Sequence, residues 1–185
     1  PSSRLLLAID EGTSSARAIV FTLAGEVVGL GRRSVPLSYP HPGWVEQDPE
    51  ALWQAQYEAV QEALNAASVP PSAIQAVGIT NQRETTIAWD STGRPYGPAI
   101  VWQDRRTAPY CEKLAPYKDL LREKTGLLPD PYFSATKIQW MLKEGGIPPT
   151  AHFGTVDAWL LYKMTGKART DVSNASRTLL FNLHT

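Results

Sequence analysis

The sequence predicts an α/β chain in which helices flank a mixed β-sheet. Three observations lead to this prediction. The apolar runs Leu5–Ile9 and Ala18–Phe21 resemble strands, and the short polar turn between them is typical of an antiparallel pair. A third strand pattern covers Val27–Val35, after another short turn. From Pro49 onwards, helical patterns alternate with strand patterns such as Ala76–Thr80, as in α/β folds.

The first predicted helix follows a loop rich in proline and glycine at residues 36–45. Asp48 is expected to cap this helix, with Pro49 at its first helical position. Its apolar residues at helical spacing predict the face that packs on the core: Trp53, Tyr57, Val60 and Leu64. Two stretches are expected to form buried strands that end in polar residues, 76–80 and 98–102, and a further strand is expected at 85–89.

From Thr107 to the end the sequence is mainly helical. A break at Pro116 separates two short helices, and Gly126 is expected to end the second. Ser134 is predicted to cap the next helix, and Thr155 to open the last clear one, with Asp157 in its positive first turn. The abrupt end at residue 185 indicates part of a longer protein.

Composition excludes several functional classes. Lysine plus arginine and aspartate plus glutamate number 18 each, so no net charge favours nucleic acid or an acidic membrane surface. No apolar run reaches the roughly 20 residues that span a bilayer, and the start does not resemble a signal peptide. We therefore expect a cytoplasmic protein. Cys111 is the only cysteine, which excludes internal disulfides and thiolate zinc clusters and favours a simple packing role.

The turn after the first strand is a candidate phosphate site. Gly12 allows a ligand to approach the backbone, short hydroxyls and an arginine follow it, and Asp10 could hold a hydrated Mg²⁺. The residues expected to meet the phosphates are Gly12, Thr13, Ser14, Ser15 and Arg17. The alternative is an ordinary solvent-exposed hairpin. The Walker A and dinucleotide-binding glycine patterns are absent.

A second candidate site lies at Arg83 and Glu84, where a predicted strand ends. Arginine only donates hydrogen bonds and ionised glutamate only accepts them. The pair could therefore bind neighbouring hydroxyls while each charge offsets the desolvation of the other. The alternative is a surface ion pair, worth about 0–1 kcal/mol. We expect this corner and the Asp10 turn to open into one cleft.

Several blocks in order along the chain resemble the glycerol kinases of the FGGY carbohydrate kinase family. The most specific block is GITNQRETTIAW, and the others are PGWVEQDP, AIVWQDRRT, TGLLPDPYFSATK, GTVDAWLLYKMTG and DVSNASRTLLFN. The resemblance implies a ribonuclease H-like fold of the actin-like ATPase type. It also implies that residues 1–185 are an incomplete N-terminal lobe, with the rest of that lobe and the C-terminal lobe missing.

The resemblance further implies ATP-dependent phosphorylation of glycerol, with Mg²⁺ near Asp10 and a homo-oligomer for the full-length protein. Arg83 and Glu84 are expected to hold glycerol hydroxyls, Tyr132 to add a contact, and Trp102 to line the carbon skeleton. A general-base aspartate is expected beyond Thr185, so residues 1–185 alone should be inactive. Remaining alternatives are another sugar or polyol kinase and a non-catalytic ATPase-like module.

Two departures from the family pattern stand out. Position 11 is Glu where Gln is usual, and the loop between Leu142 and Phe153 is short. Because neighbouring residues of a strand point to opposite faces, an Asp10 that faces the phosphates would turn Glu11 away from them. His41, His152 and His184 lie in no metal-ligand or catalytic spacing. The charges of Asp104, Arg105 and Arg106 are expected to form a local cluster.

Overall fold

The computed structural model describes residues 4–185, which divide into two compact units. The first unit contains the residues up to Pro36 together with Glu50–Gln82, and the second contains Leu37–Pro49 and Arg83–Thr185.

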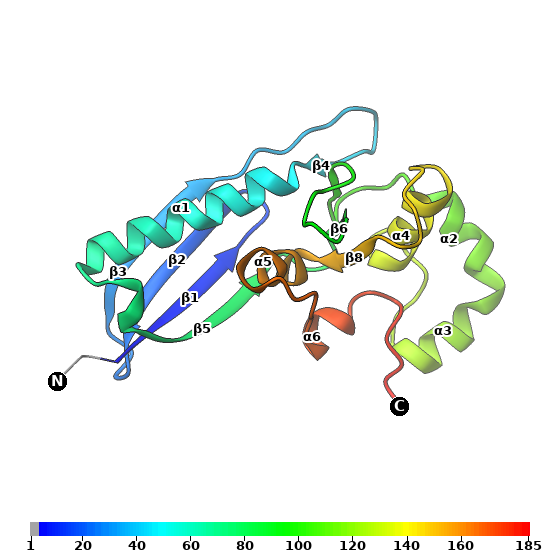
Figure 1. The fold of residues 1–185 in the computed structure, drawn as a ribbon. Coiled ribbons are helices and arrows are strands. Elements are labelled where there is room, and N and C mark those ends of the chain that lie inside the picture. Colours follow the sequence, from blue (N-terminus) through cyan, green and yellow to red (C-terminus); the bar gives the residue numbers. More distant parts are fainter. Residues whose placement is uncertain (1–3) are drawn as a thin grey trace. The chain divides into compact units, whose positions relative to one another are not determined.

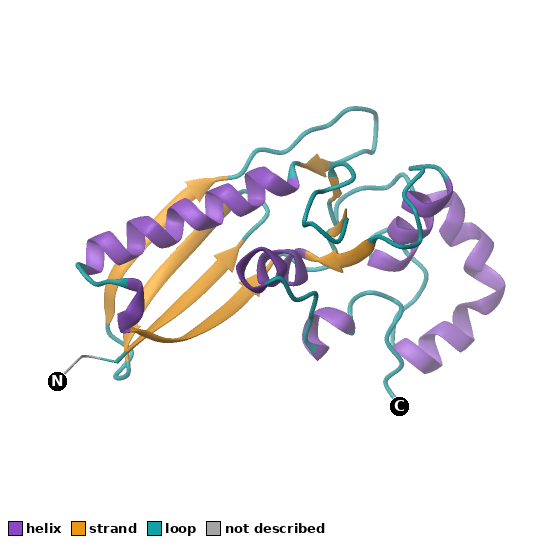
Figure 2. Cartoon of the chain, viewed as in Figure 1, coloured by secondary structure: helices purple, strands orange, loops and turns teal. Residues whose placement is uncertain are grey.

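The first unit contains the mixed sheet that the sequence predicts (Figures 1 and 2). Its strands lie in the order β3-β2-β1-β5. The three antiparallel strands are β1 (Leu5–Glu11), β2 (Ser15–Thr22) and β3 (Val27–Ser34). Strand β5 (Ile74–Asn81) follows the short 3-10 helix η1 (Pro71–Ala73) and pairs in parallel with β1. The polar ends of β1 and β5 therefore lie side by side, with Asp10 opposite Thr80.

Helix α1 (Pro49–Ala67) packs closely on β3 (Figure 1). A Cβ atom at Gly31 would lie 2.0 Å from the Ala59 carbonyl oxygen, and one at Gly29 would lie 2.2 Å from that of Ala63. The fully buried residues of the helix are Leu52, Gln56, Ala59 and Ala63, and the two that lie against the glycines are alanines. The predicted face was wrong in part, because Tyr57 is 47 % exposed. Close contact with two glycines selects alanines rather than aromatic rings for this face.

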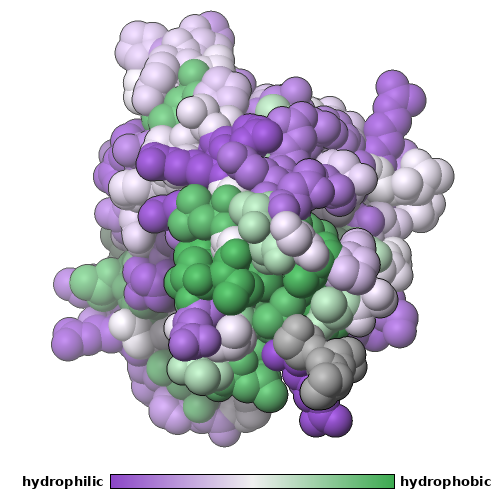
Figure 3. All heavy atoms as spheres, turned by 90° about the vertical axis from the view of Figure 1, so that its left-hand side faces the viewer, coloured by the Kyte–Doolittle hydropathy of each residue, from purple (hydrophilic) through white to green (hydrophobic). Residues whose placement is uncertain are grey.

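The opposite face of the sheet carries apolar side chains that remain accessible, among them Leu6 and Leu30. Strand β5 lies at the sheet edge, and Val77 is 48 % exposed. The prediction of a buried strand at residues 76–80 was therefore wrong: these residues are apolar, but they have a neighbouring strand on one side only. Figure 3 shows hydrophobic side chains gathered in a continuous area on the side that it faces.

The second unit contains a small antiparallel sheet in the order β4-β7-β6-β8. Its strands are β4 (Glu46–Gln47), β7 (Ala99–Ile100), β6 (Thr86–Trp89) and β8 (His152–Thr155). Buried Ala88 and Ile100 form a core with Met141 of a neighbouring helix. Strand β6 lies within the strand predicted at 85–89 and is fully buried, whereas β8 was not anticipated from the sequence.

The helices of the second unit follow the predicted breaks. They are α2 (Ala108–Leu114), η2 (Ala115–Tyr117), α3 (Lys118–Thr125), α4 (Ser134–Lys143), α5 (Val156–Thr165) and α6 (Val172–Ala175). Gly126 and Gly166 end α3 and α5 in the left-handed conformation, at φ 74° and 71°. Within residues 4–185, the helices all fall short of the length and hydrophobicity that crossing a bilayer requires.

Candidate functional site

The predicted phosphate turn is a tight hairpin between β1 and β2. The Gly12 amide donates to the Ser15 carbonyl at 2.9 Å, and a Cβ atom at position 12 would lie 3.0 Å from that oxygen. The Ser14 carbonyl accepts a 2.9 Å hydrogen bond from the amide of Val35, so the residue after β3 also holds the turn. Ser14 is exposed and Thr13 is half-buried, whereas Ser15 is only 6 % exposed. An anion at this turn therefore has Thr13 and Ser14 within easier reach than Ser15.

Asp10 and Arg17 lie directly opposite each other across β1 and β2. Their charged groups form an ion pair at 3.4 Å, and their side chains are 36 % and 48 % exposed, respectively. The cross-strand register thus places one carboxylate and one guanidinium beside the hairpin turn. In the described residues 4–185, the acidic, histidine and cysteine side chains form no group of three that could enclose a metal ion. The half-exposed Asp10 carboxylate is of the oxygen type that binds hydrated cations.

Glu11 lies on the face of β1 opposite to Asp10, as expected. It shares the buried face with Leu5, Leu7 and Ile9 and is 0 % exposed. Both carboxyl oxygens are buried without a hydrogen-bond partner. Burial, followed by the negative charge of Asp10, raises the pKa of Glu11 to about 9. At neutral pH this side chain is therefore an uncharged acid on the face of β1 opposite to Asp10.

The second unit holds Glu84 at a strained corner that leads into β6. Glu84 is 2 % exposed and has a φ of 67°, a left-handed conformation that is unfavourable for a residue with a side chain. Its carbonyl accepts hydrogen bonds from the hydroxyls of Ser134 at 3.0 Å and Thr86 at 2.9 Å. Its carboxylate accepts one from Arg177 Nε at 2.6 Å. Contacts from the adjoining strand and from two distant segments therefore hold Glu84 in place.

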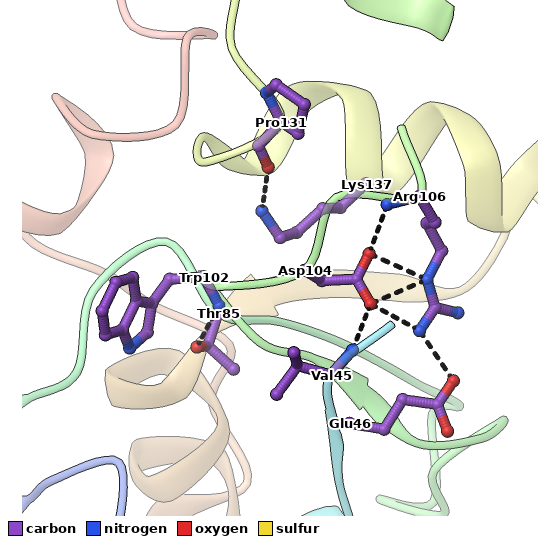
Figure 4. A network of polar contacts seen from close by, with 8 residues as sticks. All are labelled: Val45, Glu46, Thr85, Trp102, Asp104, Arg106, Pro131 and Lys137. Atoms are coloured by element: carbon purple, nitrogen blue, oxygen red, sulfur yellow. Dashed lines mark hydrogen bonds and ion pairs between the residues drawn. The ribbon is translucent and has the colours of Figure 1, made fainter. Parts of the chain in front are cut away.

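Two aromatic side chains of the predicted alcohol site contact each other. The ring centroids of Trp102 and Tyr132 lie 5.6 Å apart, in an edge-to-face arrangement. The Trp102 amide donates to the Thr85 hydroxyl at 3.1 Å, which ties it to the residue after Glu84 (Figure 4). The ring of Tyr132 lies 5.7 Å from the guanidinium carbon of Arg177. The structure thus brings Glu84, Trp102 and Tyr132 together.

Arg83 and Glu84 were expected to offset each other's charge, but the structure separates them. Arg83 is exposed, whereas Glu84 is buried, and the ion pair of Glu84 is with Arg177 instead. The reason is the sharp corner at Glu84, which turns the two neighbouring side chains into different surroundings. The Asp10 turn and the Glu84 corner belong to different units, and their common cleft stays a prediction.

The expected charge cluster at Asp104 divides into an exposed part and a buried part. Arg105 pairs with Asp130 at the surface, with side chains that are 56 % and 43 % exposed. Asp104 and Arg106 are buried and joined at 2.8 Å, and Arg106 also binds Glu46 at 2.7 Å (Figure 4). Asp104 also accepts from the Val45 amide at 2.7 Å. This network anchors the chain directly after Trp102.

A cavity of about 320 Å³ lies next to this corner in the second unit and is lined in part by Ser134 and Thr86, whose hydroxyls bond to the Glu84 carbonyl. Its walls include Ser134, Trp89 and Phe153 and are mainly apolar, and none of the predicted alcohol-site residues lines it. Its apolar walls do not suit a small polyol, so we assign the candidate site to the residues around Glu84.

Sequence reasoning missed three residues that hold this corner. Ser134 was expected to cap α4, but Phe133 occupies the N-cap and the Ser134 hydroxyl bonds to Glu84. Lys137, with 0 % exposure, donates to the backbone carbonyl of Pro131 (Figure 4) and also to those of Tyr132 and Phe133. Lys137 lies among the positions of α4 that the helical spacing predicts to be buried. Because a buried lysine is rare unless its charge has partners, this position could have indicated a structural role. For Arg177, 93 residues from its partner, the local sequence held no such signal.

Known protein families and relatives match almost the whole chain. Residues 5–185 match the N-terminal domain of the FGGY family of carbohydrate kinases. The chain is 50 % identical over 187 residues to the glycerol kinase of Thermococcus onnurineus, which covers 97 % of this chain and 38 % of that protein. With the glycerol kinase of Thermus brockianus the identity is 53 % over 193 residues, covering 98 % of this chain and 39 % of that protein.

Solved structures give a consistent result. The crystal structure of Plasmodium falciparum glycerol kinase with ADP matches with a TM-score of 0.88 and 31 % identity, over 99 % of this chain and 38 % of that one. A gluconate kinase from Lactobacillus acidophilus matches with a TM-score of 0.89 at 20 % identity, over 98 % and 37 % of the two chains. The latter likeness concerns the fold alone. The chain spans about 38 % of the length of such relatives.

Proposed function

Because the chain belongs to the FGGY family of carbohydrate kinases, we propose that it forms the alcohol-binding corner and first phosphate turn of a glycerol kinase. The reaction transfers the γ-phosphoryl group of ATP to a terminal hydroxyl of glycerol. Such a transfer depends on aligning the two substrates and on balancing negative charge at the transferred group. In this proposal the first unit supplies the phosphate turn and the second unit supplies the alcohol-binding corner.

The observation that carries the proposal is the conformation of Glu84. Strained backbone at a buried, charged residue is typical of functional sites, where the surroundings enforce a conformation that costs about 1–3 kcal/mol. A carboxylate with about four acceptor positions still has acceptor capacity after its bond to Arg177. It can therefore accept hydrogen bonds from polyol hydroxyls, while exposed Arg83 donates and the Trp102–Tyr132 pair covers the carbon chain.

The hairpin turn suits the phosphate side of the same reaction. Thr13 and Ser14 offer hydroxyl and amide donors, and Arg17 offers a positive charge. Asp10 would contribute a carboxylate oxygen to a hydrated Mg²⁺ ion at the phosphates. When bound, that ion would offset phosphate charge. In the absence of the ion, the ion pair with Arg17 at 3.4 Å offsets the negative charge of Asp10.

A chimera tests the proposal. Residues 1–185 replace the matching segment of the Thermus brockianus glycerol kinase, giving a protein that we term the swap enzyme. We expect it to phosphorylate glycerol with ATP. Glu84→Gln should raise the KM for glycerol about tenfold to hundredfold, the effect of losing one or two charge-assisted hydrogen bonds. The KM for ATP should change little.

The matched control is Glu123→Gln, because the Glu123 side chain is 67 % exposed and forms a surface ion pair with neighbouring Lys124. An unchanged glycerol KM in Glu84→Gln would contradict the assignment of the alcohol site. Phosphorylation of a pentulose or gluconate in preference to glycerol would contradict the choice of substrate. Residues 1–185 alone should form no glycerol 3-phosphate, since the general base is expected outside them.

A further inference from the structure

Arg177 reaches the alcohol site from a segment far along the chain. It follows α6, and its Nε atom donates to Glu84 Oε1 at 2.6 Å. The Arg177 side chain is 29 % exposed and that of Glu84 is 2 % exposed. The buried carboxylate therefore receives its compensating charge from residue 177 and not from its neighbour Arg83.

Arg177 also lies against the aromatic side of the site. Its guanidinium carbon lies 5.7 Å from the ring centroid of Tyr132 and 5.1 Å from that of Phe133, within the range of cation–π attraction. The hydrogen bond to Glu84, with the largest effect, and the Tyr132 hydroxyl both raise the pKa of Arg177. One cation thus contacts both the acidic and the aromatic residue of the site.

The backbone around Arg177 is fixed on both sides. The Arg177 amide donates to the Asn174 carbonyl at 3.1 Å, and the Asp171 carboxylate caps α6 by accepting from the Asn174 amide at 2.7 Å. The carbonyl of the next residue, Thr178, accepts from the Ala135 amide in the first turn of α4 at 2.8 Å. The guanidinium is therefore presented from a docked segment, which lowers the entropic cost of holding Glu84.

We propose that Arg177 is a positioning residue of the alcohol site, which orients the Glu84 carboxylate and the Tyr132 ring toward one polyol ligand. This inference rests on the proposed function. A bond to one carboxylate oxygen restricts rotation of the group and leaves other lone pairs for hydroxyls. The planar guanidinium also presents a face to the aromatic rings, which an ammonium group cannot do in the same way.

The test compares Arg177→Gln with Arg169→Gln in the swap enzyme. Arg169 is exposed and donates to the adjacent Ala168 carbonyl, so its replacement should leave both KM values within twofold. Arg177→Gln should raise the KM for glycerol at least tenfold and that for ATP less than twofold. Arg177→Lys should recover only part of the loss. If Arg177→Gln does not fold, Arg177→Lys carries the same comparison of the two KM values.

A double-mutant cycle with Glu84→Gln separates positioning from general stability. If Arg177 acts through Glu84, adding Arg177→Gln to Glu84→Gln should raise the glycerol KM less than twofold further. An equal effect with and without the Glu84 carboxylate, or an equal rise in the KM for ATP, would overturn the inference. The inference would also be overturned if Glu84→Gln raised the KM for glycerol and Arg177→Gln did not. A normal Glu84→Gln enzyme would instead overturn the proposed alcohol site.

Discussion

The guanidinium carbon of Arg106 lies 3.7 Å from the centroid of the Trp44 ring. The same side chain is 2 % exposed and binds Asp104 and Glu46 (Figure 4). Arg106 thus combines an aromatic contact with two ion pairs in the interior of the second unit. Because Asp104 also binds the Val45 amide, this network joins the loop before β4 to the segment that carries Trp102.

Arg106→Met should lower the free energy of unfolding by about 3–5 kcal/mol, because it leaves the buried Asp104 carboxylate without its counter-charge. Urea denaturation of residues 1–185 measures the change. The adjacent Arg105→Met is the control: its exposed pair with Asp130 should be worth about 0–1 kcal/mol. Equal losses in the two variants would show that Arg106 has no special role in stability.

Gly31→Ala should lower the free energy of unfolding of the first unit by about 3 kcal/mol, at the upper end for overpacked cores. A Cβ atom at this position would lie 2.0 Å from the Ala59 carbonyl oxygen of α1, so the helix must move away from β3. Thermal and urea unfolding measure the loss.

Gly78→Ala in β5 provides a control of opposite sign. No atom lies within 4 Å of a Cβ at position 78, and replacing glycine at an unstrained position stabilises by about 0.4–1 kcal/mol through the unfolded state. A Gly31→Ala variant as stable as Gly78→Ala would contradict the close packing of α1.

The sequence predicts those parts of the fold that local signals determine. Gly126 ends α3 where expected because a left-handed helix end favours glycine. The buried face of α1 could not be predicted in this way. It depends on Gly29 and Gly31, which belong to another element, and their close approach places Ala59 inside and Tyr57 outside.

The candidate site also has residues that the sequence predicts and contacts that it does not. Glu84, Trp102 and Tyr132 were recognisable because their sequence blocks resemble a family. Their supporting contacts were not, because the partner of Glu84 lies 93 residues away. The different surroundings of Arg83 and Glu84 depend on one backbone angle, the φ of 67° at Glu84. A strand pattern read from residue types does not reveal such an angle.

Glu11→Gln should remove part of the pH dependence of stability. The pKa of Glu11 is raised from 4.5 to about 9 by burial and by Asp10. Between these values the folded chain keeps a proton that the unfolded chain has released, so the contribution of Glu11 to stability is highest below about pH 4.5 and decreases as the pH rises toward 9. The slope is about 1.4 kcal/mol per pH unit.

Urea unfolding of the wild type and Glu11→Gln from pH 5 to 9 checks this prediction. The variant should be the more stable protein at pH 8, and the difference should shrink toward pH 5. Glu123→Gln, at an exposed position, should leave the wild-type slope unchanged. Parallel curves for wild type and Glu11→Gln would show that Glu11 is ionised in the folded chain.

Lys137→Met should change the pH dependence in the opposite sense. Burial lowers the pKa of Lys137 from 10.5 to about 8, against the charges of Asp104 and Glu84, which raise it. Between pH 8 and 10.5 the unfolded chain holds a proton that the folded chain has released. The contribution of Lys137 to stability therefore rises with pH over this window, by about 1.4 kcal/mol per pH unit.

The comparison is again urea unfolding, now from pH 7.5 to 10.5, with Lys143→Met as the control at an exposed position of the same helix. The stability of the wild type relative to Lys137→Met should increase across the window, whereas Lys143→Met should follow the wild type. At pH 7 the variant also loses the bonds that hold the backbone around Tyr132, so the swap enzyme with Lys137→Met should have a higher KM for glycerol. A Lys137→Met protein with the wild-type pH slope and the wild-type KM would show that the Lys137 ammonium neither titrates in this range nor supports the Tyr132 loop.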